Sequence, residues 1–130
     1  MPNRVLITGA SCGIGAATAR LFAQEGWDVA INCNHSRTEA EALAAELSGL
    51  GVRAVPIQAD ISDPEQAGRL VREAEAALGP LEAVVCCAGT ALVQQLLTDT
   101  TVEQWRDLMS VDLDGMFYTL RAAIPGLVRQ

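Results

Sequence analysis

The sequence has 130 residues, of which 50% are hydrophobic, and it carries a formal net charge of −7 from 16 acidic and 9 basic residues. This length suits one domain with a sizeable core and is too short for two. All the basic residues are arginine. Because an acidic chain offers no basic face, we expect no nucleic acid and no anionic membrane surface among its partners.

Four cysteines occur, at Cys12, Cys33, Cys86 and Cys87. Their spacings do not suit a zinc site, so no metal is expected. We interpret them as reduced thiols of a cytoplasmic protein. Residues 1–4 lead directly into a predicted strand, so no signal peptide is expected. No apolar run has the length that crosses a bilayer.

The first predicted elements are a strand at 4–8 and a helix at 13–25. The strand contains Val5, Leu6 and Ile7 without alternation, which is typical of a strand buried on both faces of a parallel sheet. Gly26 follows as the helix stop.

A second strand is predicted at 28–32, followed by a helix that ends near 49–51. Ser36 and Glu39 fit a capping box at the start of that helix. A third strand follows at 53–58.

Ser62, Pro64 and Glu65 mark another helix start: a capping residue, a proline in the first turn and a glutamate three residues after the serine. That helix runs to about Leu78, before Gly79-Pro80. A strand, a loop with a short helical turn and a long helix bent at Pro125 then follow, at 81–86, 89–100 and 102–130.

Strands and helices therefore alternate throughout residues 1–130. This alternation implies right-handed crossovers and a parallel sheet covered by helices, an α/β domain.

A glycine-rich turn follows the first strand, with Gly9, Gly13 and Gly15 in the run Thr8-Gly9-Ala10-Ser11-Cys12-Gly13-Ile14-Gly15. Gly9 permits a tight turn, Gly13 lets backbone approach a pyrophosphate, and Gly15 lets the helix pack closely. Free N–H groups at the helix start then face the anion, and Ser11 adds a hydroxyl donor. The alternative is an ordinary glycine-containing turn.

The spacing T-G-x-x-x-G-x-G resembles the signature of the short-chain dehydrogenase/reductase family. Asp60 resembles the family's acidic residue after the third strand, which pairs with the adenine. The run Cys86-Cys87-Ala88-Gly89 is similar to the family's N-N-A-G stretch, and residues 105–115 are similar to its long helix. Within the family, the sequence most resembles the 3-oxoacyl-carrier-protein reductases. The resemblance covers the first half of a family member.

The resemblance implies a Rossmann-type, doubly wound parallel sheet with strand order 3-2-1-4 and the later strands absent. It implies hydride transfer between a nicotinamide dinucleotide and a small carbonyl or alcohol substrate. The residues expected at the cofactor are Gly9, Ser11, Cys12, Gly13, Ile14, Gly15, Asn34, Ser36, Arg37, Asp60, Ile61, Cys87, Ala88 and Gly89.

The cofactor preference depends on the end of the second strand, where Asp or Glu usually holds the ribose hydroxyls of NAD. Cys33 occupies that place. Ser36 and Arg37 could bind a 2′-phosphate, so NADP(H) is favoured over NAD(H). The alternatives are that Ser36 only caps a helix and that Arg37 is a solvated surface charge.

The catalytic tyrosine and lysine of the family, four residues apart, have no counterpart in this sequence. It contains no lysine, and Ala122 stands four residues after its single tyrosine, Tyr118. We therefore expect Tyr118 to be a packing residue and the chain alone to be inactive. Asp112 takes the place of the family's helix asparagine, and an ionised carboxylate donates no hydrogen bond.

Three functions stay open at this point. The first is the cofactor-binding half of an oxidoreductase, the second a non-catalytic dinucleotide-binding module, and the third an interaction fragment. If the fourth strand lies at a sheet edge, it would present unpaired backbone groups. Since family members commonly pair helices between subunits, a homo-oligomer is expected.

Overall fold

The computed structural model describes residues 2–90 and 94–130 of the chain. Its centre is a four-stranded parallel sheet in the order β3-β2-β1-β4. This order confirms the predicted topology. The strands are β1 (Arg4–Thr8), β2 (Asp28–Cys33), β3 (Ala54–Gln58) and β4 (Ala83–Cys86).

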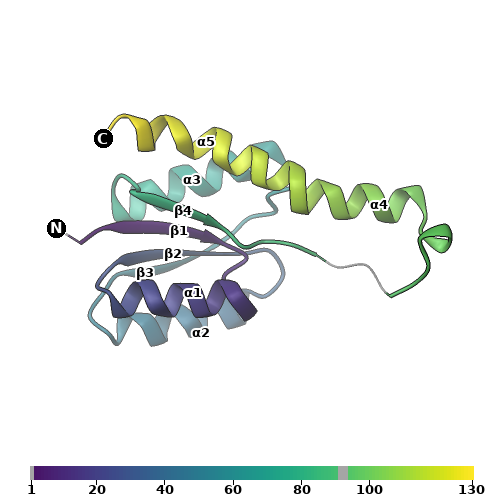
Figure 1. The fold of residues 1–130 in the computed structure, drawn as a ribbon. Coiled ribbons are helices and arrows are strands. Elements are labelled where there is room, and N and C mark those ends of the chain that lie inside the picture. Colours follow the sequence, from purple (N-terminus) through teal and green to yellow (C-terminus); the bar gives the residue numbers. More distant parts are fainter. Residues whose placement is uncertain (1, 91–93) are drawn as a thin grey trace.

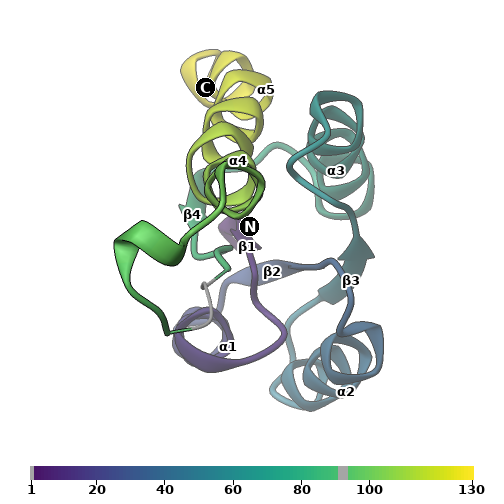
Figure 2. The ribbon, with the colours of Figure 1, turned by 90° about the vertical axis from the view of Figure 1, so that its right-hand side faces the viewer.

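Helices cover both faces of this sheet (Figures 1 and 2). The helical segments are α1 (Gly13–Gln24), α2 (Arg37–Ser48), α3 (Pro64–Leu78), a 3₁₀ turn η1 (Leu97–Asp99), α4 (Val102–Met109), a π-helical segment η2 (Ser110–Gly115) and α5 (Met116–Val128). In Figure 1, α1 and α2 lie below the sheet, and α3 and α5 lie above it.

The burial of β1 explains why its sequence does not alternate. Val5 and Ile7 belong to the core cluster between the sheet and helices α1 and α2. Leu6 belongs to the cluster between the sheet and helices α3 and α5. All three side chains are fully buried. Each of these three residues therefore gains burial from one of two helical layers, as expected for a parallel strand.

Ion pairs fix the edge of the sheet where the strands begin. Asp28 is 2% exposed and accepts hydrogen bonds from Arg53 N at 2.8 Å and Arg53 Nε at 3.0 Å. Arg53 Nη2 also donates to the carbonyl of Leu78 at the end of α3. One arginine therefore ties β2 to α3 and satisfies a carbonyl that the helix leaves free.

Two predicted helix caps are wrong. Ser36 occupies the N-cap position of α2, but its side chain makes no capping hydrogen bond, because its backbone (φ −99°, ψ 53°) lacks the extended conformation of a normal N-cap. The cap of α3 is Asp63, whose carboxylate accepts from Glu65 N at 3.0 Å, and not Ser62. The Ser62 hydroxyl instead donates to Asp60 at 2.6 Å.

The predicted long helix is not uniform. It consists of α4, the π-helical segment η2 and α5, and α5 continues through Pro125 to Val128. A π segment contains an extra residue per turn, which a 3.6-residue pattern does not reveal. The short helical turn expected between 89 and 100 is confirmed as η1; within that loop, residues 91–93 lie outside the described part.

Candidate functional site

A cavity of about 570 Å³ opens at the edge of the sheet where the strands end. Its lining comes mainly from the ends of the four strands and the segments that follow them, namely residues 9, 11, 12, 14, 15, 32–36, 59–61 and 87–90, with Asp107 of α4 and Val111 of η2. The carboxyl edge of a doubly wound parallel sheet is where such folds bind ligands. Segments far apart in sequence thus share one concave surface.

The glycine-rich turn has the geometry that its sequence predicts. Gly9 and Gly13 have φ of +60° and +58°, a conformation that other residues seldom adopt. A Cβ on Gly9 would lie 2.5 Å from Cα of Ala88, and one on Gly15 would overlap the carbonyl oxygen of Gly9. Gly15 thus lets α1 pack against the turn itself. The space around Gly13 is open.

The two helices that begin at this cavity have no side-chain cap. Neither Cys12 before α1 nor Ser36 before α2 makes a capping hydrogen bond, whereas Asp63 caps α3 and Thr101 caps α4. The N–H groups in the first turn of α1 have no intrahelical acceptor. Together with the helix dipole, they form a favourable place for an anion.

Asn32 fixes the turn to the sheet, a role that was not predicted from the sequence. Its side chain is buried at 2% exposure; Oδ1 accepts from Gly9 N at 3.1 Å, and Nδ2 lies 3.2–3.4 Å from the carbonyl oxygens of Cys33, Ile57 and Ala59. One amide therefore joins the ends of β2 and β3 to the turn after β1. The signal available in the sequence was Asn32 itself, a polar residue within the otherwise apolar run 29–33.

Thr8 plays a similar part on the other side of β1. Its fully buried hydroxyl oxygen accepts hydrogen bonds from the backbone N–H groups of Cys87 and Ala88, both at 3.2 Å. The loop after β4 is thereby held against Gly9.

Asp60 lines the cavity with an oriented carboxylate. Its Oδ1 accepts from both N and Oγ of Ser62, at 3.0 and 2.6 Å, and Gln66 Oε1 accepts from its backbone N–H. Among the described residues, no side chain or backbone group donates to Oδ2. That oxygen is therefore available to a ligand donor.

The described cysteines are free thiols in different environments. Cys12 is exposed and lines the cavity, as do buried Cys33 and half-buried Cys87. Burial raises the pKa of the Cys33 thiol above its ordinary value, although Arg37 opposes the shift. Burial, with a smaller contribution from Cys87, also raises the pKa of Cys86. Neither thiol is activated toward nucleophilic chemistry.

Most of the predicted cofactor-binding residues do line this cavity. The exceptions are Gly13, which stands beside it in the turn, and Arg37, whose Nε bonds to Glu41 Oε1 at 2.9 Å on α2. The cavity also has lining residues that were not predicted from the sequence: Asn32, Cys33, His35, Ala59, Thr90, Asp107 and Val111.

Asp112 and Tyr118 lie outside this lining. Asp112 Oδ1 accepts a hydrogen bond from Thr90 N at 2.8 Å, so its carboxylate ties η2 to the loop after β4. Tyr118 packs, partly buried, against the core cluster beneath α3 and α5, which confirms its expected packing role.

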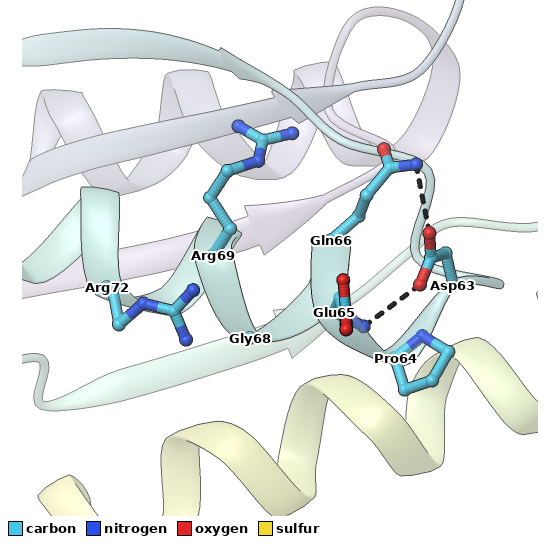
Figure 3. A pocket seen from close by; sticks show the side chains of 7 residues that line it. All are labelled: Asp63, Pro64, Glu65, Gln66, Gly68, Arg69 and Arg72. Atoms are coloured by element: carbon cyan, nitrogen blue, oxygen red, sulfur yellow. Dashed lines mark hydrogen bonds between the residues drawn. The ribbon is translucent and has the colours of Figure 1, made fainter.

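A second hollow, of about 450 Å³, lies along α3 (Figure 3). Two of its polar side chains already have intramolecular partners: Asp63 caps the helix, and Arg69 bonds to Glu73 at 3.0 Å and to the carbonyl of Gln58 at 2.8 Å. It is also formed by one helix, whereas the cavity at the carboxyl edge joins several elements. The carboxyl-edge cavity is therefore the candidate site.

Across residues 2–90 and 94–130, no helix combines the length and apolar character needed to cross a bilayer. The same residues hold no group of three or more His, Cys, Asp or Glu side chains arranged to bind a metal ion.

Comparison with known proteins shows the family of the chain. The family model described as short chain dehydrogenase matches residues 3–130, and the chain belongs to that family. The chain is 34% identical, over all of its length, to 3-oxoacyl-acyl-carrier-protein reductase FabG of Staphylococcus aureus, of which it covers 52%.

Solved structures show the same fold. A short chain dehydrogenase from Burkholderia cenocepacia in complex with NADP matches with a TM-score of 0.90 and 36% identity, over 95% of this chain and 50% of that chain. The NADH-dependent reductase A1-R′ complexed with NAD matches with a TM-score of 0.89 and 25% identity, over 97% and 52%. The chain thus spans about half the length of these relatives.

Proposed function

We propose that this chain forms the nicotinamide-dinucleotide site of an oxidoreductase, at the cavity on the carboxyl edge of the sheet. The observation that carries the proposal is the pair of uncapped helix starts, at Cys12 and Ser36, beside a glycine-rich turn. These features suit a ligand with phosphates at two places. When bound, the dinucleotide would supply or accept a hydride.

The residues of the cavity divide into three groups in this proposal. The turn from Gly9 to Gly15 would hold the pyrophosphate through backbone N–H groups and Ser11. Asp60, through its free Oδ2, would accept from the adenine amino group. The loop from Cys87 to Gly89, held by Thr8, would lie against the nicotinamide half.

We propose NADP(H) as the preferred form. Cys33 places no carboxylate at the end of β2, so nothing at that position repels a 2′-phosphate. The uncapped start of α2 and the free Ser36 hydroxyl favour an anion there. One solved relative is in complex with NADP and another with NAD, so the shared fold alone does not set the preference.

The reaction that we propose for the whole protein is hydride transfer between the nicotinamide and a carbonyl or alcohol, as in a 3-oxoacyl-carrier-protein reductase. In the given sequence, neither Tyr118 nor any lysine forms the family's catalytic pair. Asp112 is a candidate to hold a water molecule through Oδ2 while Oδ1 stays bonded to Thr90. We therefore assign cofactor binding to this chain and expect no turnover from it alone.

The experiment is a titration of the purified chain with NADPH, following energy transfer from Trp27 and Trp105 to the nicotinamide. Saturable binding that 2′,5′-ADP competes for would support a dinucleotide site whose adenine end is complete. If the folded chain binds neither NADPH nor NADH, the proposal fails, and an interaction fragment becomes the better explanation.

We also propose that the chain self-associates through the outer face of α4, η2 and α5. Large apolar side chains are exposed there, at Trp105, Leu113, Phe117, Ile124 and Val128. Strand β4 beside them is the edge of the described sheet. A second copy would bury this apolar area. Analytical ultracentrifugation should show a dimer or larger species that Phe117→Glu dissociates; a monomer at high concentration would contradict the proposal.

A further inference from the structure

The exposed face of η2 and α5 carries two opposite charges among its apolar side chains. Asp114, Phe117, Arg121, Ile124 and Val128 are all exposed, and they follow one another at intervals of three and four residues. That spacing places the five side chains in one stripe along a helix and is typical of the contact line between two paired helices. We call these five residues the seam.

The charges of the seam have no ionic partner within the described chain. Among residues 2–90 and 94–130, neither Asp114 nor Arg121 takes part in an ion pair. The Arg121 guanidinium lies over the rings of Phe117 and Tyr118, 5.5 and 5.9 Å from their centroids. The cation is therefore held against the apolar side chains that a docking partner would cover.

A partner that covers the seam has to satisfy both charges. Removing a guanidinium or a carboxylate from water costs free energy unless an opposite charge comes within reach. A purely apolar partner would leave Asp114 and Arg121 covered without such a charge. The seam therefore favours a partner that presents an acid opposite Arg121 and a base opposite Asp114, at the same spacing.

A second copy of the chain meets this requirement when its helix runs antiparallel to the first. The midpoint between Asp114 and Arg121 falls beside Phe117 in the sequence. A two-fold axis at that point sets each Asp114 opposite Arg121 of the other copy, because such an interface is reciprocal. The two Phe117 rings then pack near the axis. A parallel pairing would instead set like charges opposite each other, which is destabilising.

We propose that the chain forms an antiparallel homodimer through the seam, with two reciprocal ion pairs between Asp114 and Arg121 on either side of Phe117. This inference rests on the proposed self-association and names its partner and its orientation. The apolar residues of the seam supply the buried area, whereas the ion pairs fix the register of the two helices and reject other partners.

The test uses charge reversals and sedimentation equilibrium at low ionic strength. Asp114→Arg and Arg121→Asp should each raise the dissociation constant of the dimer by about tenfold or more, because each sets like charges opposite each other twice. An equimolar mixture of the two variants should form heterodimers about as tight as the original homodimer, since both ion pairs are then restored. The double variant Asp114→Arg/Arg121→Asp should also recover the homodimer.

Two exposed residues away from the seam provide matched controls. Glu25 follows α1, Arg72 lies on α3, and neither takes part in an ion pair among the described residues. Glu25→Arg and Arg72→Asp change the net charge by the same amounts as the seam reversals. They should leave the dissociation constant of the dimer within about twofold of its original value, because they do not touch the seam.

The possible failures are distinguishable. A mixture of the two seam reversals that stays monomeric, or controls that loosen the dimer equally, would overturn the antiparallel seam. An original chain that is monomeric at high concentration would overturn the seam together with the self-association. Binding of NADPH is measured separately and should be equal in all these variants, because Asp114 and Arg121 lie outside the lining of the cavity. A dimer with these properties that binds no NADPH would support the seam and refute the cofactor site.

Discussion

Replacing Gly13 with alanine separates the backbone strain of the glycine-rich turn from its contact with the cofactor. Gly13 has φ of +58°, and nothing lies within 4 Å of the Cβ that alanine would add. Alanine is disfavoured at positive φ by about 1 kcal/mol. For a domain of this size, that free energy corresponds to a fall of about 3–6 °C in the thermal unfolding midpoint.

Gly26 offers a matched control for this substitution. It has φ of +86° and equally open surroundings, but it precedes β2 at the opposite edge of the sheet. Gly26→Ala should therefore lower the midpoint by a similar amount and leave NADPH affinity unchanged. Gly13→Ala should weaken NADPH binding by about tenfold or more, because its methyl group stands where the pyrophosphate approaches. Equal affinities of the two variants for NADPH would refute the placement of the pyrophosphate at this turn.

Three further predictions concern residues around the same cavity. Asn32→Ala should lower the free energy of unfolding in urea by about 2–3 kcal/mol, since it leaves the N–H of Gly9 and buried carbonyls without their partner; an unchanged midpoint would contradict its bridging role. Cys12→Asp should raise the unfolding midpoint because the carboxylate caps α1, and it should weaken the binding of both NADPH and NADH. Cys12→Ser should weaken binding less. Tighter binding by the aspartate variant would exclude an anion at this helix start. Iodoacetamide at about pH 8 should label exposed Cys12 before Cys33 and Cys86, whose pKa values burial raises, and NADPH should slow the labelling of Cys12, as mass spectrometry would show.

The raised pKa of Cys33 also has a consequence for stability at high pH. When the pKa of a thiol is higher in the folded chain than in the unfolded one, the thiol stabilises the fold fully at pH values below its pKa in the unfolded chain. That contribution is lost as pH rises through the pKa of the thiol in the folded chain, so the free energy of unfolding should decline above about pH 9.

The parts of the molecule that follow from local sequence were predictable. The unalternating Val5-Leu6-Ile7 run indicated a strand buried on both faces, and the spacing of Gly9, Gly13 and Gly15 indicated the turn. In both cases, the pattern and the structure that it predicts lie within a few neighbouring residues. The strand order followed from a resemblance to a known family, because pairing between β1 and β4 joins residues nearly 80 positions apart.

The features that the sequence did not reveal depend on tertiary contacts. Asn32 bonds to residues 23 to 27 positions away, and nothing in the strand pattern specifies those partners. Ser62 and Asp63 both suit a helix cap before Pro64; the choice falls on Asp63 because Asp60 takes the Ser62 hydroxyl.

The uncapped starts of α1 and α2 connect stability with ligand binding. A good N-cap is worth about 1 kcal/mol, so each of these helices lacks stabilisation that Asp63 gives to α3. The free N–H groups lie at the one edge of the sheet where all four strands end, beside a turn kept open by glycine. An anion bound there would supply the missing acceptors at both helices. A ligand with two phosphate positions would then stabilise the chain through contacts that the free protein leaves unsatisfied, which is the physical basis for expecting the dinucleotide to raise its unfolding midpoint.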